Sequence, residues 1–182
     1  PGYRHLFDHW EGPVANAAAA ATSVAMNGDT AVTAVFAPVP FAARASVACG
    51  AYHTMVLKND STVWTFGDNT AGKLGDGTTT IPRWPVQTLG VGGEGYLSGV
   101  VGVEGGYSFS LAVLNDGTVR SWGSNSRGQL GVGPGNPIPS SAVPVVVLDE
   151  TGTGSLSGIT SVVGGGNHAA ALRYDGTLWT WG

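Results

Sequence analysis

The sequence contains a single cysteine, Cys49, among 182 residues. One cysteine excludes an intrachain disulfide, and it says little about the compartment, because a chain of this length can build a core without covalent cross-links. Charged residues are also scarce, at 11% of the chain, against roughly 25% in an average soluble protein. The surface must therefore be rich in glycine, serine, threonine and asparagine.

Basic residues are few and scattered. The chain has eight lysines and arginines, and its net charge is −4. No basic cluster is available to neutralise phosphates, so we expect no nucleic-acid partner. The longest apolar stretch, residues 31–50, is interrupted by Pro38, Pro40 and Arg44, so we expect no membrane insertion in this segment.

Glycine and tryptophan are abundant instead. The chain has 30 glycines and 10 prolines, yet 42% of its residues are hydrophobic and six are tryptophan. Disordered chains lack such apolar and aromatic content, so we expect a folded protein of one large or two small domains.

An internal repeat organises most of the chain. Three segments align without a gap: GAYHTMVLKNDSTVWTFG (50–67), GYSFSLAVLNDGTVRSWG (106–123) and GGNHAAALRYDGTLWTWG (165–182). The connections repeat as well, because the stretches that begin at Pro85 and Pro144 share Pro-Val, a leucine and Leu-Ser-Gly at one fixed offset. The repeat unit is therefore about 60 residues long, which is typical of a repeat architecture.

Residues 67–77, GDNTAGKLGDG, resemble a phosphate-binding P-loop. Gly67, four residues, Gly72 and Lys73 match that motif, but Leu74 stands where the motif needs serine or threonine. The next copy has glutamine and leucine at the positions of Lys73 and Leu74, and two further glycines follow at once, so no helix can begin there. We therefore predict no nucleotide site and no cofactor.

Each copy predicts two strands joined by a tight turn. Asp116-Gly117 and Asp175-Gly176 lie between apolar runs, where glycine can adopt the positive φ that hairpin turns favour. Ser61 replaces this glycine in the first copy, which should strain the turn by about 1 kcal/mol. Alternation in the second strands predicts apolar residues on both faces of each hairpin, so we expect both faces to be covered. Such a hairpin suits a blade stacked between neighbouring blades.

The repeated pattern Gly-x-Asn-x-x-Gly-x-Leu-Gly predicts a rigid connector, in which asparagine caps turns and Leu74 and Leu130 enter the core. We interpret the repeated residues as structural, and none as catalytic, cofactor-binding or metal-ligating. They are Gly50, His53, Asp60, Gly67, Asn69, Gly72, Leu74, Gly75, Gly106, Asp116, Gly117, Trp122, Gly123, Asn125, Gly128, Gln129, Leu130, Gly131, His168, Asp175, Gly176, Trp181 and Gly182.

Residues 42–182 resemble the regulator of chromosome condensation repeat family, whose pattern is followed almost throughout from Gly106 to Gly131. The resemblance implies an all-β fold, a partial β-propeller with about two and a half blades of an expected seven, and further blades in the full-length chain. This chain departs from the family pattern at Phe109, which replaces a histidine kept at His53 and His168, and at Lys73, which replaces a glutamine. The replacement by Phe109 argues against a catalytic or metal-binding role for that histidine.

Residues 1–37 resemble the C-terminal half of the divergent internalin B-type bacterial repeat. The match comprises Phe7, Trp10, Gly12, Val14, Met26, Asp29 and Val32 to Phe36. The resemblance implies a small β-grasp-like fragment from a bacterial secreted or surface protein. Residues 38–46 are predicted to be an extended linker, followed by the propeller repeats at 47–182.

A metal site in the N-terminal segment is the alternative reading of His5, Asp8, His9 and Glu11. His5 and His9 have the spacing of a helical zinc pair, but Trp-x-Gly is typical of strand and turn. On a strand the two histidines would lie about 13 Å apart, too far for one ion. We therefore predict no metal.

The sequence favours a non-enzymatic binding or adhesion scaffold of a secreted or cell-surface bacterial protein, with propeller loops presented to a protein or a glycan. The alternative is a guanine-nucleotide-exchange regulator of a small GTPase, which the family resemblance alone suggests. A hydrolase or lyase finds no support, because the recurring aspartates occupy one turn position in every copy. The chain has no initiator methionine, and we expect it to be a fragment.

Overall fold

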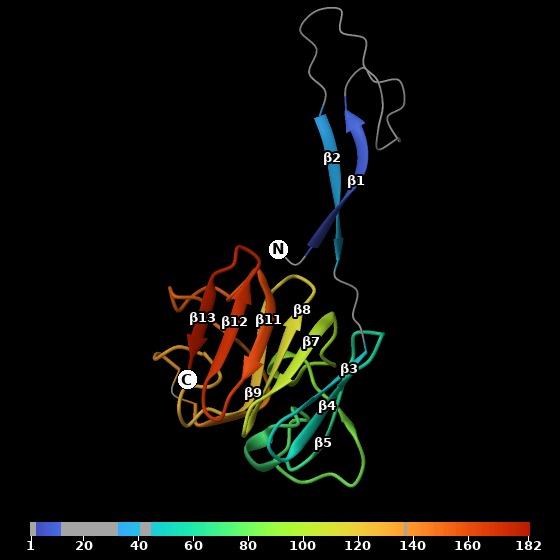
Figure 1. The fold of residues 1–182 in the computed structure, drawn as a ribbon. Helices are drawn as coiled ribbons and strands as arrows, with labels where there is room; N and C mark the ends of the chain where they lie inside the picture. The colour runs from blue at the N-terminus through green and yellow to red at the C-terminus, as the bar shows by residue number, and fades with distance from the viewer. Residues whose placement is uncertain (1–2, 12–32, 41–44, 137) are drawn as a thin grey trace, which may run out of the picture. The chain divides into compact units, whose positions relative to one another are not determined.

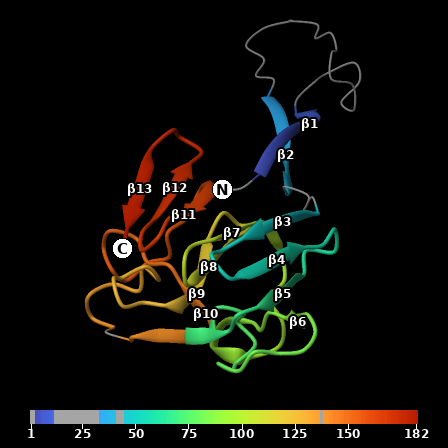
Figure 2. The same ribbon diagram turned by 60° about the horizontal axis from the view of Figure 1, so that its bottom comes forward.

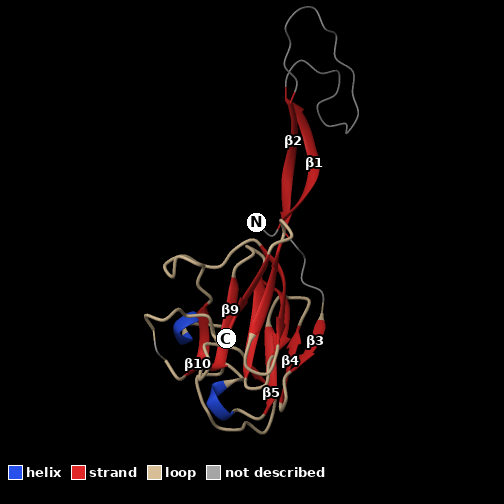
Figure 3. Ribbon diagram, turned by 60° about the vertical axis from the view of Figure 1, so that its left-hand side comes forward, coloured by secondary structure: helices blue, strands red, loops and turns tan. Residues whose placement is uncertain are grey.

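The computed structural model describes residues 3–11, 33–40, 45–136 and 138–182, and it divides the chain into two compact units, Tyr3–Phe41 and Ala42–Gly182. Both units are built from antiparallel β-strands (Figure 1). Within these described residues, the helical positions form two short 3₁₀ turns, η1 (Thr70–Gly72) and η2 (Val91–Gly93), which Figure 3 shows among strands and loops. The predicted all-β class is confirmed.

The N-terminal unit contains one antiparallel hairpin, in which β1 (Tyr3–Glu11) pairs with β2 (Thr33–Pro40). The register shifts between Phe7 and His9, so one extra residue interrupts the alternation of β1. The two prolines of the predicted linker lie at the end of β2. Much of the internalin-type pattern, including Gly12, Val14, Met26 and Asp29, lies outside the described residues, and that resemblance stays a prediction.

The C-terminal unit contains three sheets, which we call blades 1, 2 and 3 (Figures 1 and 2). Blade 1 consists of β3 (Ser46–Cys49), β4 (His53–Leu57), β5 (Val63–Gly67) and β6 (Val86–Gln87). Blade 2 consists of β7 (Val100–Gly105), β8 (Phe109–Leu114), β9 (Val119–Ser124) and β10 (Ser140–Val146). Blade 3 consists of β11 (Ile159–Gly164), β12 (Ala169–Arg173) and β13 (Leu178–Trp181). Strands follow chain order in every blade, which agrees with the predicted two and a half blades.

The turns between the second and third strands have the predicted geometry. Gly117 and Gly176 adopt φ values of 77° and 86°, and Ser61, at the same position, adopts 64°. Serine is therefore held in a conformation that L-residues avoid. The turn in blade 1 is strained as expected.

The core lies between the blades. Met55, Leu57 and Val63 of blade 1 pack with Ala112 and Trp122 of blade 2. A second cluster joins blades 2 and 3 through residues such as Phe109, Leu111, Leu130, Ile159 and Ala171. The prediction that both faces of every hairpin are covered is wrong for the outer blades: Phe66 is 39% exposed and Leu178 67%, because no blade packs on these faces within the described residues.

Candidate interaction surface

Each blade is fastened to the next through the connector that follows its third strand. The indole Nε1 of Trp122 donates to the carbonyl of Lys73 at 2.8 Å, and the Ser110 hydroxyl donates to the same oxygen at 2.8 Å. At the next junction, Trp181 Nε1 donates to the carbonyl of Gln129 at 2.8 Å. The indole N–H of the repeated tryptophan therefore bonds each of these blades to the connector that precedes it.

The connectors, residues 68–80 and 124–136, are held by the predicted asparagines. The side-chain carbonyls of Asn69 and Asn125 accept the backbone N–H of Leu74 and Leu130, each at 3.0 Å. Both leucines are fully buried, as predicted. Sequence reasoning missed a further bond: the buried hydroxyls of Thr65 and Ser121 donate to the leucine carbonyls at 2.8 and 2.7 Å. These residues alternate with the apolar positions, so the repeat alignment could have shown them.

The geometry of residues 67–77 excludes a phosphate cradle. The N–H groups of Gly72 and Gly75 already donate to backbone carbonyls, at 2.9 and 3.0 Å. Lys73 is 2% exposed, and its ammonium group is hydrogen-bonded to Asp68. Neither these two N–H groups nor the lysine is available to a phosphate. These residues instead hold the connector in its folded conformation.

His53 is 3% exposed, and its Nε2 lies 2.8 Å from the Ser110 hydroxyl. A hydroxyl has one hydrogen, and that of Ser110 points to the Lys73 carbonyl, so Nε2 of His53 must donate. Nδ1 is then a bare acceptor, buried and without a partner. Burial, followed by the charge of Lys73, lowers the pKa of His53 from 6.5 to about 4, so the ring is neutral at pH 7. Its role is structural.

The other copies of this histidine position differ. Phe109 is fully buried in blade 2, while His168 of blade 3 is exposed, because no following blade covers it within this chain. The one histidine–serine hydrogen bond among the described residues is that of His53 and Ser110, and both side chains are out of reach of a substrate. This arrangement has no catalytic use.

Every aspartate in residues 45–182 stabilises a local turn. In each case the threonine two residues later donates both its N–H and its hydroxyl to the carboxylate. The Thr62 hydroxyl bond, for example, lowers the pKa of Asp60 to about 2. Asp60, Asp116 and Asp175 are thus turn residues. Among the described residues, no group of three or more potential ligands is placed to hold a metal ion.

The remaining repeated residues serve turns and close approaches between segments. Positive φ values occur at Gly67, Gly72, Gly75, Gly117, Gly123, Gly128, Gly131, Gly176 and Gly182. A Cβ at Gly106 would collide with the ring of Phe109, and one at Gly50 with that of His53. These glycines therefore serve the backbone geometry of the blades and connectors.

Two exposed aromatic residues do face solvent together. Tyr52 and Tyr107 are 62% and 53% exposed, and their rings meet edge to face with centroids 5.7 Å apart. They lie on the loops that join the first and second strands of blades 1 and 2. Backbone bonds from Asp68 to Tyr52 and from Ser124 to Ser108, both 2.8 Å, hold these loops against the connectors. We call the end formed by these loops and connectors the loop end.

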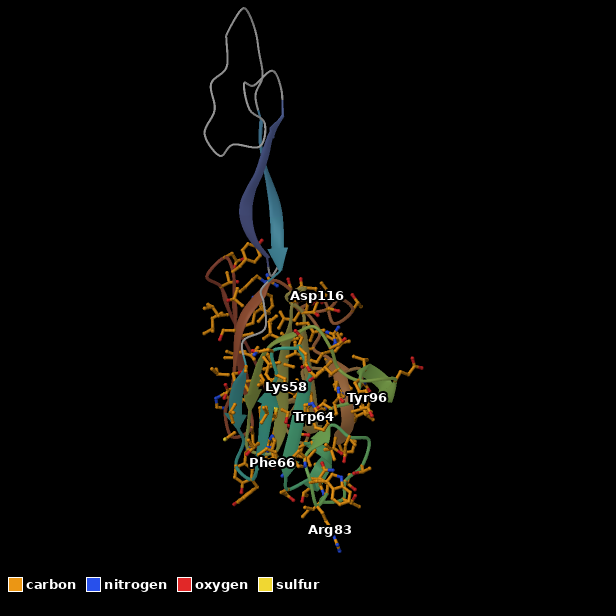
Figure 4. All side chains as sticks on the ribbon, turned by 90° about the vertical axis from the view of Figure 1, so that its right-hand side faces the viewer. Lys58, Trp64, Phe66, Arg83, Tyr96 and Asp116 are labelled. Carbon is orange, nitrogen blue, oxygen red and sulfur yellow. The ribbon has the colours of Figure 1, made fainter. Side chains whose placement is uncertain are left out.

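The opposite end carries the hairpin turns with their aspartates, and Figure 4 shows Asp116 there and Arg83 at the far side of the unit.

Sequence reasoning did not nominate Tyr52 or Tyr107. Their repeat counterparts are Ser108 and Ala51, so the blade itself does not require tyrosine. An aromatic residue at a loop position where the repeat has none was the available signal.

Comparison with known proteins agrees with this architecture. Two family models, both described as the regulator of chromosome condensation (RCC1) repeat, match residues 45–73 and 100–129, and residues 60–113 and 116–172. The chain belongs to this family. Among curated relatives, Protein pim1 of Schizosaccharomyces pombe is 32% identical over 80% of this chain, and the human probable E3 ubiquitin-protein ligase HERC6 is 35% identical over 75%.

The chain spans only 28% of the length of pim1 and 13% of that of HERC6. Among solved structures, human WBSCR16 matches 88% of this chain and 38% of its own with a TM-score of 0.63 and 25% identity. Prp20p of Saccharomyces cerevisiae matches 75% of this chain and 32% of its own with a TM-score of 0.57 and 24% identity. These structures support the RCC1 propeller fold. Within the described residues, no helix is long and apolar enough to cross a membrane.

Proposed function

We propose that this RCC1-repeat chain is part of a non-enzymatic scaffold that binds a protein partner through the loop end of blades 1 and 2. The observation that carries the proposal is the pair Tyr52 and Tyr107. The polar residues of the repeat are occupied by turns, connectors and junctions, whereas these two rings contact each other and solvent.

Tyrosine is enriched in protein interfaces, because it offers a large rigid ring and a polar hydroxyl at a small cost in side-chain entropy. The two rings come from different blades, and the junction beneath them is fully packed. Rigid loops on such a scaffold are the usual location of binding residues. A protein partner also fits the description of Prp20p with its binding to Gsp1p and histones.

The finer expectations stay predictions. A glycan ligand and a secreted or cell-surface bacterial location rest on the resemblance of residues 1–37. Guanine-nucleotide exchange on a small GTPase rests on the family resemblance alone, and this chain spans 28% of the length of pim1. Faster nucleotide release from a candidate GTPase in the presence of the chain would favour that alternative.

The proposal is tested with a random-peptide phage library selected on the immobilised chain. Peptides that bind should lose at least tenfold in affinity to the variants Tyr52→Ser and Tyr107→Ala, which install the residues that the other blade has at these positions. Asp116→Asn, at the turn end, is the matched control and should leave binding within twofold. Binders that ignore both tyrosine variants would refute the assignment of the loop end.

A further inference from the structure

The junction between blades 1 and 2 encloses two ionisable side chains. His53 and Lys73 are 3% and 2% exposed. The ammonium group of Lys73 is paired with Asp68, whereas Nδ1 of His53 has no hydrogen-bond partner. A buried polar atom without a partner is uncommon in a folded protein. It leaves His53 with one unused protonation site at the centre of the junction.

The surroundings of His53 oppose a proton at Nδ1. The titratable groups that face the ring are Lys73 and Asp68, both on the first connector. From blade 2, β8 contributes the Ser110 hydroxyl, which already donates to the Lys73 carbonyl and can only accept from His53. The loop before β8 contributes the backbone of Gly106. A proton would therefore create a buried N–H without an acceptor, and a cation beside Lys73, whose charge opposes the proton more than the charge of Asp68 favours it.

The junction between blades 2 and 3 has the same architecture without these groups. Phe109 stands in place of His53, Gln129 in place of Lys73, and Ala169 in place of Ser110. Trp181 still donates to the connector carbonyl, as Trp122 does. The molecule thus contains a titratable junction and a neutral copy of it.

We propose that the junction between blades 1 and 2 is an acid-sensitive hinge, which opens when His53 gains a proton and so separates Tyr52 from Tyr107. This inference rests on the proposed function only for its consequence, the release of a partner bound across the two tyrosines. The hinge itself follows from the buried, unpartnered Nδ1 and the neighbouring ammonium group.

The expected size follows from linkage. The pKa of His53 is about 4 in the closed junction and has its ordinary value of 6.5 once the ring reaches water. The closed form therefore binds fewer protons between these pH values. Between pH 7 and pH 4.5 the equilibrium for opening should rise by about 60-fold. A junction without a titrating group should not follow this dependence.

Two buried alanines report on the two junctions separately. Ala112 and Ala171 hold the same repeat position in blades 2 and 3, and they are 0% and 1% exposed. We would introduce Ala112→Cys or Ala171→Cys into a chain with Cys49→Ala, and follow the reaction of the new thiol with dithiodipyridine, which reacts across this pH range. After correction with a model thiol, the Ala112→Cys chain should react about 60-fold more readily at pH 4.5 than at pH 7. The Ala171→Cys chain should change less than threefold.

A double variant provides the control. His53→Phe with Ser110→Ala replaces the titrating ring and its hydroxyl partner by their counterparts in the second junction and leaves Lys73 in place. In the Ala112→Cys background it should abolish the pH dependence. Circular dichroism at pH 7 verifies that each variant is folded. An equal rise at Ala112→Cys and Ala171→Cys, or a rise that survives the double variant, would overturn the hinge.

Binding is measured separately, with a phage-selected peptide that depends on both tyrosines. At ten times its Kd at pH 4.5, the peptide should slow the reaction of the Ala112→Cys thiol about tenfold at that pH, because it binds only the closed junction. Thiol reactivity without any tyrosine-dependent peptide would support the hinge and count against the proposed function. A peptide that depends on both tyrosines but leaves the thiol reaction unchanged would remove the link between the two.

Discussion

The close approach between a connector and the next blade can be tested by replacing Gly75 with alanine. The change in the free energy of unfolding, compared with that of a control glycine, measures what this approach contributes to stability. Gly75 adopts a φ of 72°, and a Cβ there would lie 2.8 Å from Thr88 Cγ2 and 2.9 Å from Trp122 Nε1. Gly92 has nearly the same backbone, with a φ of 70°, but a Cβ there would meet nothing within 4 Å. The two glycines therefore share the conformational cost of substitution and differ only in the contact.

The shared cost is about 1 kcal/mol, because alanine at positive φ is strained by about 1–2 kcal/mol and regains about 0.4–1 kcal/mol through a less flexible unfolded chain. At Gly75 the new methyl group also displaces the buried ring of Trp122. Overpacking costs about 1–3 kcal/mol. Loss of the bond from Trp122 to the Lys73 carbonyl adds about 0.5–1.5 kcal/mol. We expect Gly75→Ala to destabilise the chain by about 2.5–5.5 kcal/mol and Gly92→Ala by about 1 kcal/mol.

Urea denaturation at pH 7, followed by circular dichroism, measures both free energies of unfolding. The m-values should agree between the variants, so that the midpoints compare stability directly. Equal costs at the two glycines would show that the close approach contributes nothing and that conformation alone determines the need for glycine.

Three further predictions concern the turns, acid and the exposed faces. Ser61→Gly should stabilise the chain by about 0.5–1 kcal/mol and Gly117→Ser should destabilise it by at least that amount; opposite shifts in urea midpoint check this, and equal midpoints would contradict it. The pKa of Asp60 is lowered to about 2, chiefly by its bonds from Thr62. The stability that its carboxylate contributes is therefore complete above pH 4 and is lost as the pH falls toward 2. The drop in urea midpoint between pH 4 and pH 2.5 should be smaller in Asp60→Asn than in the parent chain. The apolar outer faces of blades 1 and 3 should make residues 1–182 associate when expressed alone, and a stable monomer in light scattering would refute this.

Much of the fold could be predicted because it is local or periodic. Asp-Gly between alternating apolar residues specifies a hairpin turn, and even the exception at Ser61 adopts the predicted positive φ. Recurrence of the whole pattern specified the blades and the burial of Leu74 and Leu130. A P-loop could be excluded by comparing the copies, because Gln129 replaces Lys73 in the next repeat and leucine occupies the serine or threonine position in both.

The sequence predicts that Phe66 and Leu178 are covered, and the structure exposes both. An alternation of apolar residues shows which side chains share a face, but it does not show whether a neighbouring blade covers that face. The pairing of Tyr52 with Tyr107 was equally out of reach. These residues occupy different positions in their repeats, and their rings meet only because the loops of the two blades lie side by side in the fold.

The sequence by itself therefore determined the β-class, the repeat, the number of blades and the chemistry of each turn, since these depend on neighbours along the chain and on periodicity. Only the tertiary structure decided the contents of the junctions. His53 and Ser110 lie 57 residues apart, and their hydrogen bond determines the tautomer of the histidine. Burial in the junction, followed by the charge of Lys73, lowers its pKa. Such properties arise from burial and from contacts across blades, and a pattern of residue types along one strand does not encode which side chains will face each other there.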